Sequence, residues 1–171
     1  MGVEGTGPPP STASFEVPQL RTLFNLSSSR WQPIVDVTIR GLTLTATRYS
    51  YMDPHGVPSA GDFAVPRSAA VLLDGTEGTT VSDCNLTRLD GNGLIVSGYN
   101  RNATVLNNTF SWIGDNAVVV WGKTNETAAN PLEGFDGTDG NHPQDTRVAG
   151  NVIREIGIYK KCVRPRGWTH S

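Results

Sequence analysis

Hydrophobic residues recur along residues 81–122 with a period of 24 positions. The equivalent residues, one period apart, are Val81 and Val105, Leu86 and Phe110, Leu89 and Ile113, and Leu94 and Val118. Within each period apolar and polar residues alternate in short runs, and Gly, Asp and Asn stand between the runs. Alternation with period two predicts β-strands, and a fixed repeat of this length predicts stacked structural units. The chain is therefore predicted to be all-β, with short parallel strands stacked about 4.8 Å apart.

The repeat also predicts which residues lie above one another. Four segments share a Val followed five positions later by Leu, Phe or Ile, namely Val37 with Leu42, Val81 with Leu86, Val105 with Phe110, and Val148 with Ile153. Alternation places Leu94 and Val96 toward the interior, and Ile95 and Ser97 toward the outside. Trp121 is expected at the outer end of its strand, in register with Ser97 and Leu73.

Cys84, Asn108 and Asn151 occupy equivalent positions of consecutive repeats. Stacked Asn amides can form a hydrogen-bonded ladder that satisfies turn backbone groups, and we expect one here. Cys84 is interpreted as a small inward-facing residue. A bridge from Cys84 to Cys162 is not favoured, because two cysteines make no disulfide framework.

The chain divides into three parts by composition. Residues 1–30 are rich in Pro, Ser, Thr and Gly and are expected to form a lead-in or cap. Residues 31–157 hold the repeats, with insertions at 48–68 and 123–145 that flank the same type of strand. Residues 158–171 form a basic, irregular tail that does not continue the repeat. Since a stack of repeats needs polar caps, we expect a fragment or an altered end, incomplete at the C-terminal side and prone to aggregate.

The pattern of residues 81–122 resembles the right-handed parallel β-helix repeat of the pectin-lyase-like superfamily. The resemblance covers residues 70–157 well and 34–47 in part. It implies an all-β, right-handed parallel β-helix (a solenoid) of about four to five coils. It also implies a polysaccharide or oligosaccharide substrate along the outer face of one sheet, between the two insertions.

The activity is less defined than the fold, because this superfamily includes hydrolases, lyases and non-catalytic proteins. The Asn-Thr-Asp, Gly-His-Gly and Arg-Ile-Lys signatures of polygalacturonases are absent from the sequence. The leading hypothesis is a glycan hydrolase or polysaccharide lyase. The alternative is a non-catalytic β-helix that binds glycans or serves as a surface scaffold.

Asp90, Asp115 and His142 are the candidate catalytic residues. Asp90 and Asp115 stand in turns of successive repeats, about 5 Å apart at the backbone if the repeats stack. Two neighbouring carboxyl groups can serve as the acid and the base or nucleophile of glycoside hydrolysis. Asp is also favoured in such turns for its local hydrogen bonds. His142 could act as a general acid or base.

Trp121, Ser97 and Arg67 are the candidate substrate-binding residues. An exposed Trp121 could stack on a sugar ring, unless an insertion folds over it. Arg67 lies in the first insertion with Asp53, His55 and Asp62, where a cation beside a carboxylate would suit proton abstraction in a lyase.

The second insertion gathers acidic residues and a histidine, namely Glu133, Asp136, Asp139, His142 and Asp145. Calcium prefers several oxygen ligands, but the spacing is not that of an EF-hand. A solvated polar loop is the simpler interpretation. No cofactor is therefore predicted, and the metal, if there is one, stays unknown.

Composition narrows the partners further. The formal net charge of −2 offers no basic surplus for phosphates, so nucleic acid is not an expected partner. No segment approaches the ~20 apolar residues of a membrane span. No signal peptide is visible at the N-terminus. Asn-x-Ser/Thr sequons at five positions suggest an extracellular or secretory-pathway protein, although Asn- and Thr-rich repeats generate sequons by composition alone; they start at Asn25, Asn85, Asn102, Asn107 and Asn125.

Overall fold

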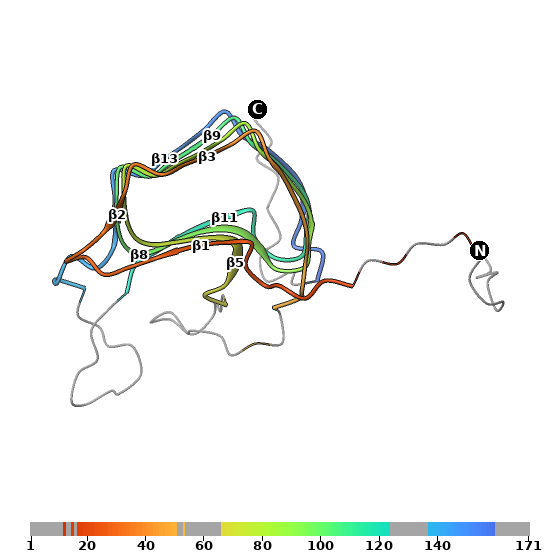
Figure 1. Cartoon of the computed structure of the whole chain (residues 1–171), viewed down its shortest axis with the longest axis horizontal. Coiled ribbons are helices and arrows are strands. Elements are labelled where there is room, and N and C mark those ends of the chain that lie inside the picture. The colour runs from red at the N-terminus through yellow and green to blue at the C-terminus, as the bar shows by residue number, and fades with distance from the viewer. Residues whose placement is uncertain are drawn as a thin grey trace, which may run out of the picture.

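The computed structural model describes residues 12, 15, 17–50, 53, 66–123 and 137–159. This part of the chain contains no helix, and all of its strand ladders are parallel (Figure 1). The strands form three sheets, here called I, II and III. The all-β class and the parallel pairing predicted from the sequence are confirmed.

Sheet I is the largest and has six strands. Its main path runs in the order β1 (Phe24–Ser27), β5 (Ala69–Glu77), β8 (Asn92–Arg101) and β11 (Val118–Trp121). Two short strands extend it, β2 (Ile34–Val35) beside β5 and β12 (Pro143–Gln144) beside β8. β1 lies within the expected lead-in, and β12 lies within the second insertion.

Sheets II and III have four strands each. Sheet II contains β3 (Thr38–Arg40), β6 (Thr80–Ser82), β9 (Thr104–Leu106) and β13 (Arg147–Ala149). Sheet III contains β4 (Thr43–Thr47), β7 (Asn85–Leu89), β10 (Thr109–Ile113) and β14 (Val152–Ile156). The chain passes through II, III and I in the same order again and again, and each passage is called a coil below. Figure 1 shows the coils lying over one another around a shared interior.

The register predicted from the 24-residue period is confirmed for the central coils. Val105 pairs with Val81, Phe110 with Leu86 and Leu94 with Val118. The first coil was predicted wrongly, because Ile39 and Leu44, rather than Val37 and Leu42, pair with Val81 and Leu86.

The register of the first coil is set by its corner residues. Apolar spacing alone does not decide it, because Val37 with Leu42 and Ile39 with Leu44 have the same spacing. Sheets II and III meet at left-handed residues that each stand two positions before a sheet III strand, namely Gly41, Asp83, Asn107 and Gly150. A second column of left-handed residues leads from sheet I into sheet II, namely Asp36, Gly78, Asn102 and Asp145. Gly, Asn and Asp adopt this conformation at the lowest cost. Gly41 therefore fixes the start of β4 and with it the register of Leu44.

The predicted asparagine ladder is confirmed. Asn108 Oδ1 accepts a hydrogen bond from the Cys84 backbone at 2.9 Å, and Asn151 Oδ1 accepts one from the Asn108 backbone at 2.9 Å. The Asn108 amide nitrogen also donates to the Val81 carbonyl at 2.9 Å. Cys84 is 3 % exposed and belongs to the core, as predicted. The ladder links neighbouring coils at a corner where strand pairing is interrupted.

Burial of the core changes along the stack. Phe110 and Ile113 of β10 are fully buried, whereas Ile153 and Ile156, their partners in β14, are 46 % and 44 % exposed. Leu94 and Val96 belong to the core cluster, while Ile95 is buried without belonging to it. A position in the repeat therefore decides where a side chain points, and the presence of a following coil decides how far it is buried.

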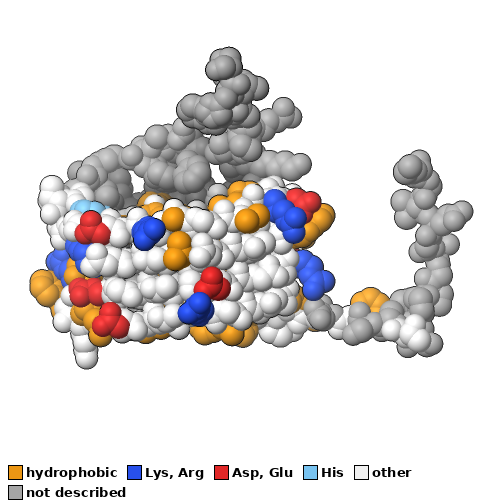
Figure 2. Space-filling view, turned by 90° about the horizontal axis from the view of Figure 1, so that it is seen from above, with side chains coloured by type: hydrophobic (Ala, Val, Ile, Leu, Met, Phe, Trp, Pro, Cys, Tyr) orange, Lys and Arg blue, Asp and Glu red, His pale blue; other side chains and the backbone are white. Residues whose placement is uncertain are grey.

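Most of the described side chains on the face shown in Figure 2 are uncharged. On the face shown in Figure 2, acidic and basic side chains are intermixed, and neither forms a continuous stripe. Among the described residues, no helix is long and apolar enough to span a membrane.

Candidate functional site

A row of outward side chains crosses sheet I near the C-terminal ends of its strands. Asp74 of β5 pairs with Ser97 of β8, which pairs with Trp121 of β11. The predicted pairing of Trp121 with Ser97 is confirmed, but the third member is Asp74 and not Leu73. The prediction failed because β8 contains an extra residue between Ser97 and Asn100, where β5 has only Gly75. Subtracting 24 positions from Ser97 therefore gives Leu73, one residue before its actual partner Asp74.

Arg67 joins this row from outside the sheet. Its guanidinium lies 3.8 Å from the centre of the Trp121 ring and donates to the Gly122 carbonyl at 2.8 Å. A longer contact of 3.3 Å reaches Ser97 Oγ. The structure thus brings the three predicted substrate-binding residues together. Arg67 covers one face of the indole, so only the other face of Trp121 remains for a sugar.

Lys123 and Asp74 form an ion pair beside this row. Lys123 Nζ lies 2.5 Å from Asp74 Oδ2, and Ser97 Oγ donates to the same oxygen at 3.3 Å. The side chain of Lys123 is 38 % exposed to solvent and that of Asp74 is 20 % exposed. The contact crosses from the coil of β11 to that of β5 and passes over Ser97.

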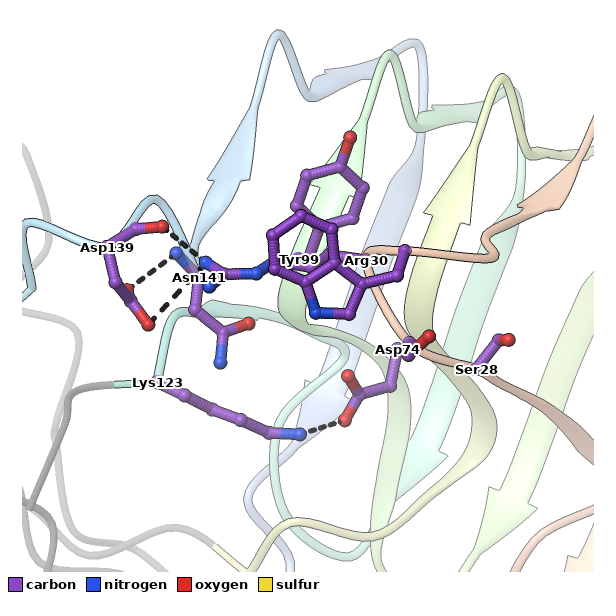
Figure 3. A pocket seen from close by; sticks show the side chains of 9 residues that line it. Ser28, Arg30, Asp74, Tyr99, Lys123, Asp139 and Asn141 are labelled. Atoms are coloured by element: carbon purple, nitrogen blue, oxygen red, sulfur yellow. Dashed lines mark hydrogen bonds and ion pairs between the residues drawn. The ribbon is translucent and has the colours of Figure 1, made fainter.

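The ion pair lies in a pocket of about 310 Å³, near the lower end of the range for ligand sites. The described residues that line it are Ser28, Ser29, Arg30, Trp31, Asp74, Tyr99, Lys123, Asp139 and Asn141. Figure 3 shows Lys123 reaching Asp74 from the side where Asp139 and Asn141 lie, with Ser28 on the opposite side.

The loop before β12 supplies a second carboxylate. Asp139 Oδ1 accepts a hydrogen bond from the Asn141 backbone at 2.9 Å, while Arg30 lies 3.7 Å from Asp139 Oδ2. The Arg30 guanidinium also donates to the Asp139 carbonyl at 2.5 Å. These contacts attach the loop to the segment that follows β1, so two distant parts of the chain close the pocket together.

Gly98 lies beside three of the residues that line the pocket, namely Asp74, Lys123 and Asn141. Its φ of +60° is left-handed, and a Cβ placed there would lie 2.8 Å from Asp74 Oδ1, 3.2 Å from Asn141 Oδ1 and 3.3 Å from Lys123 Cδ. The bulge that produces this conformation is held by buried Asn100, which donates to the Ser97 carbonyl at 2.6 Å and accepts from Thr76 Oγ1 at 2.7 Å. The absence of a side chain at Gly98 is thus what lets the polar groups converge.

Aromatic rings border the same pocket. Trp31 is 83 % exposed, with the Arg30 guanidinium 4.6 Å from its ring centre. The Tyr99 hydroxyl donates to Glu77 Oε1 at 2.5 Å, and this hydrogen bond, with burial and the Glu77 charge, raises the pKa of Tyr99. Arg101, 4.1 Å from the Tyr99 ring centre, acts in the opposite direction on that pKa. Trp31 is the most exposed aromatic ring that lines the pocket, and it offers an apolar surface there.

Asp90 and Asp115 lie at the other end of sheet I, next to the starts of β8 and β11. Ser97 stands seven positions after Asp90, a span of about 20 Å along a nearly extended chain. Asp115 is 7 % exposed, and its Oδ1 accepts a hydrogen bond from Asn116 at 2.9 Å. Burial raises the pKa of Asp90, and a hydrogen bond from Tyr159 partly offsets this rise. The structure therefore separates the two predicted catalytic carboxylates from the predicted substrate-binding residues.

His142 lies close to the predicted substrate-binding residues. Its Cβ would be 2.7 Å from a Cβ at Gly122, its carbonyl accepts from Arg101 at 2.8 Å, and its Nε2 lies 3.1 Å from Gln144 Nε2. Its neighbours Asp139 and Asn141, rather than His142 itself, line the pocket. Asp53 pairs with Arg21 at 2.9 Å. His55, Asp62, Glu133, Asp136 and Cys162 lie outside the described residues, so their predicted roles stay predictions.

Comparison of the chain with protein-family models, with curated proteins and with solved structures finds no match. The fold and the site therefore have to be interpreted from their own geometry.

The pocket can recognise a neutral polar ligand. It offers carboxylate and amide oxygens as hydrogen-bond acceptors, an ammonium and a guanidinium as donors, and an exposed indole as an apolar surface. Among the described residues, no three His, Cys, Asp or Glu side chains gather closely enough to hold a metal ion.

Sequence reasoning missed Asp74, Lys123, Asp139 and Trp31 as a group. One signal was available, since the 24-residue period aligns Asp74 with Gly98 and Gly122, so that an acidic residue occupies a position held by glycine in the other repeats. Trp31 carried no such signal, because it lies in a segment outside the period.

Proposed function

We propose that this chain is a right-handed parallel β-helix that binds a polysaccharide or oligosaccharide in the pocket at the C-terminal end of sheet I. Support comes mainly from the exposed Trp31 ring standing beside a cluster of hydrogen-bonding groups. Sugar rings present apolar C–H faces and polar hydroxyl edges, so an aromatic platform next to carboxylates and amides fits them.

Binding without bond cleavage is the function that the geometry favours. Asp74 is paired with Lys123, and Asp139 is held by Arg30 and the Asn141 backbone. These contacts hold both carboxylates in place beside the exposed Trp31 ring. Their remaining oxygen lone pairs can accept hydrogen bonds from sugar hydroxyls.

Glycan hydrolysis is the second candidate, and it rests on the presence of Asp74 and Asp139 in one pocket. In this version Asp74 and Asp139 replace the predicted Asp90 and Asp115 as the reacting pair. Release of reducing ends from plant or algal polysaccharides, lost in both Asp74→Asn and Asp139→Asn, would support it. Release of reducing ends that is unchanged by both substitutions would contradict hydrolysis by Asp74 and Asp139.

The binding proposal is tested on a glycan array with the labelled full chain, followed by calorimetric titration of the best oligosaccharide. We expect Trp31→Ala to weaken binding at least about tenfold, the loss of ~1.4 kcal/mol that stacking supplies. Trp112→Ala is the matched control, since Trp112 is also exposed (53 %) but lies on sheet III. Equal effects of the two substitutions, or no binding to any glycan, would contradict the proposal.

A further inference from the structure

Asparagines fall into two classes in this fold. Three are fully buried and hold the structure together, namely Asn92, Asn100 and Asn108. Asn116, Asn141 and Asn151 are half-buried. The side-chain nitrogen of Asn116 donates to Asn92 Oδ1 and that of Asn151 to the Val105 carbonyl, while the Asn141 backbone N–H donates to Asp139. Four are exposed, namely Asn25, Asn85, Asn102 and Asn107.

The exposed class coincides with the sequons. Each of the four exposed asparagines begins an Asn-x-Ser/Thr sequence, and none of the six buried or half-buried ones does. Asn107 and Asn108 are adjacent, yet only the exposed Asn107 has a hydroxyl residue two positions later. Composition alone would distribute sequons over both classes. The restriction of the sequons to exposed asparagines indicates that the amide nitrogens of these four side chains function where solvent can reach them.

We propose that Asn25, Asn85, Asn102 and Asn107 are acceptor sites for N-linked glycans, which also places the chain in the secretory pathway. In this transfer the side-chain amide nitrogen bonds to C1 of a lipid-diphosphate-linked oligosaccharide. The bond from C1 to the diphosphate oxygen breaks, the lipid diphosphate leaves, and the amide loses one proton. The co-reactant is the lipid-linked sugar donor, and no oxidant or reductant takes part.

The local geometry accommodates such a modification. Asn102 and Asn107 are corner residues with φ of 54° and 55°, on either side of β9 in sheet II. Asn107 is exposed, and its Oδ1 is the nearest atom that a Cβ added at Gly150 would meet. Asn85 begins β7 on sheet III. Glycans at these three positions would leave the pocket on sheet I open.

The test expresses the chain behind a cleavable secretion leader in a eukaryotic cell. Glycans are removed with an amidase in heavy-oxygen water, which marks each formerly glycosylated asparagine as labelled aspartate in mass spectrometry. We expect label at the four positions. Thr87→Ala, Thr104→Ala and Thr109→Ala should each remove the label from one site only, at Asn85, Asn102 and Asn107 respectively. Absence of label from all four, while a reporter with the same leader is glycosylated, would overturn the proposal.

A created sequon tests whether exposure matters. Ile153→Thr places a hydroxyl two residues after Asn151, whose amide nitrogen donates to the Val105 carbonyl at 2.9 Å. A glycan there would break the ladder, so we expect the glycosylated form to be retained in the cell. Ile153→Val, which creates no sequon, controls for the substitution itself. Secretion of glycosylated Ile153→Thr at the parent level would overturn the link between exposure and sequon placement.

Discussion

The two ends of sheet I use polar residues differently. At the N-terminal ends of its strands, Asn92 and Asn116 bond to one another and to nearby backbone. Toward the C-terminal ends, Asp74, Ser97 and Lys123 bond to side chains from other coils, and Asp74 and Lys123 line a pocket. The first end holds the coils in register, whereas the second presents chemistry to solvent. The predicted catalytic residues, Asp90 and Asp115, lie at the first end. Their spacing on successive coils suggested a catalytic pair, but residues with a structural role can have the same spacing.

The largest expected effect belongs to the structural end. Asn92 is 1 % exposed, donates to the Pro66 and Ser68 carbonyls, and accepts from Asn116. Asn92→Ala leaves these buried groups without partners, so the free energy of unfolding should fall by about 2–3 kcal/mol. Urea denaturation measures this. A loss below about 0.5 kcal/mol would contradict a structural role for this end.

Gly98→Ala should affect both stability and binding. The left-handed backbone costs about 1–2 kcal/mol with a side chain, and the new Cβ displaces Asp74, Asn141 and Lys123. Gly41→Ala is the matched control, because Gly41 has a φ of +70° and nothing within 4 Å of the added Cβ. We expect similar unfolding losses for the two variants, with glycan binding lost only in Gly98→Ala. Binding that survives in both would place the ligand elsewhere.

Asp74→Asn and Asp90→Asn compare one carboxylate from each end. We expect the first to weaken oligosaccharide binding about tenfold, as the loss of a charged acceptor does. The second should leave the dissociation constant unchanged within about twofold, because Asp90 lies about 20 Å along the strand from the pocket. Calorimetric titration of both variants decides this. The reverse order would restore Asp90 as the candidate site.

The smallest effect concerns the pH dependence of stability. Because burial raises the pKa of Asp90 above its ordinary value, the folded state binds this proton more tightly than the unfolded state does. The contribution of Asp90 to stability is therefore present below its unfolded-state pKa and declines as pH rises through its folded-state pKa. Asp90→Asn should remove that decline, seen as a flatter plot of unfolding midpoint against pH. An unchanged slope would show that burial of Asp90 has no energetic consequence.

The sequence predicted the strand register correctly where the 24-residue period is unbroken. It predicted the register wrongly where a corner or a bulge shifts the pairing. Val81, Phe110 and Leu94 followed the period because stacked coils need equal side chains at equal positions. Leu42 and Leu73 were misplaced because a left-handed corner at Gly41 and a bulge at Gly98 shift the count. Neither shift changes the apolar spacing, so hydrophobic pattern alone could not reveal it.

The pocket was harder to predict than the strands. Its residues come from five separate places, namely the segment after β1, the second halves of β5 and β8, and the two sides of the second insertion. Only the stacking of coils brings Asp74 and Lys123 together across Ser97. A pairing between residues 49 positions apart leaves no periodic trace in the sequence. Trp121 and Arg67 were identified because an outward Trp on a strand and a basic residue in a flanking insertion are local features.

The most direct test of the glycan-binding account follows the indole N–H signals in nuclear magnetic resonance spectra during titration with the best oligosaccharide. Trp31 borders the pocket and Trp112 lies on sheet III, so the two rings report on different faces of one molecule. The account predicts that the Trp31 signal shifts with ligand while the Trp112 signal stays in place. A shift of Trp112 with an unmoved Trp31 would contradict it.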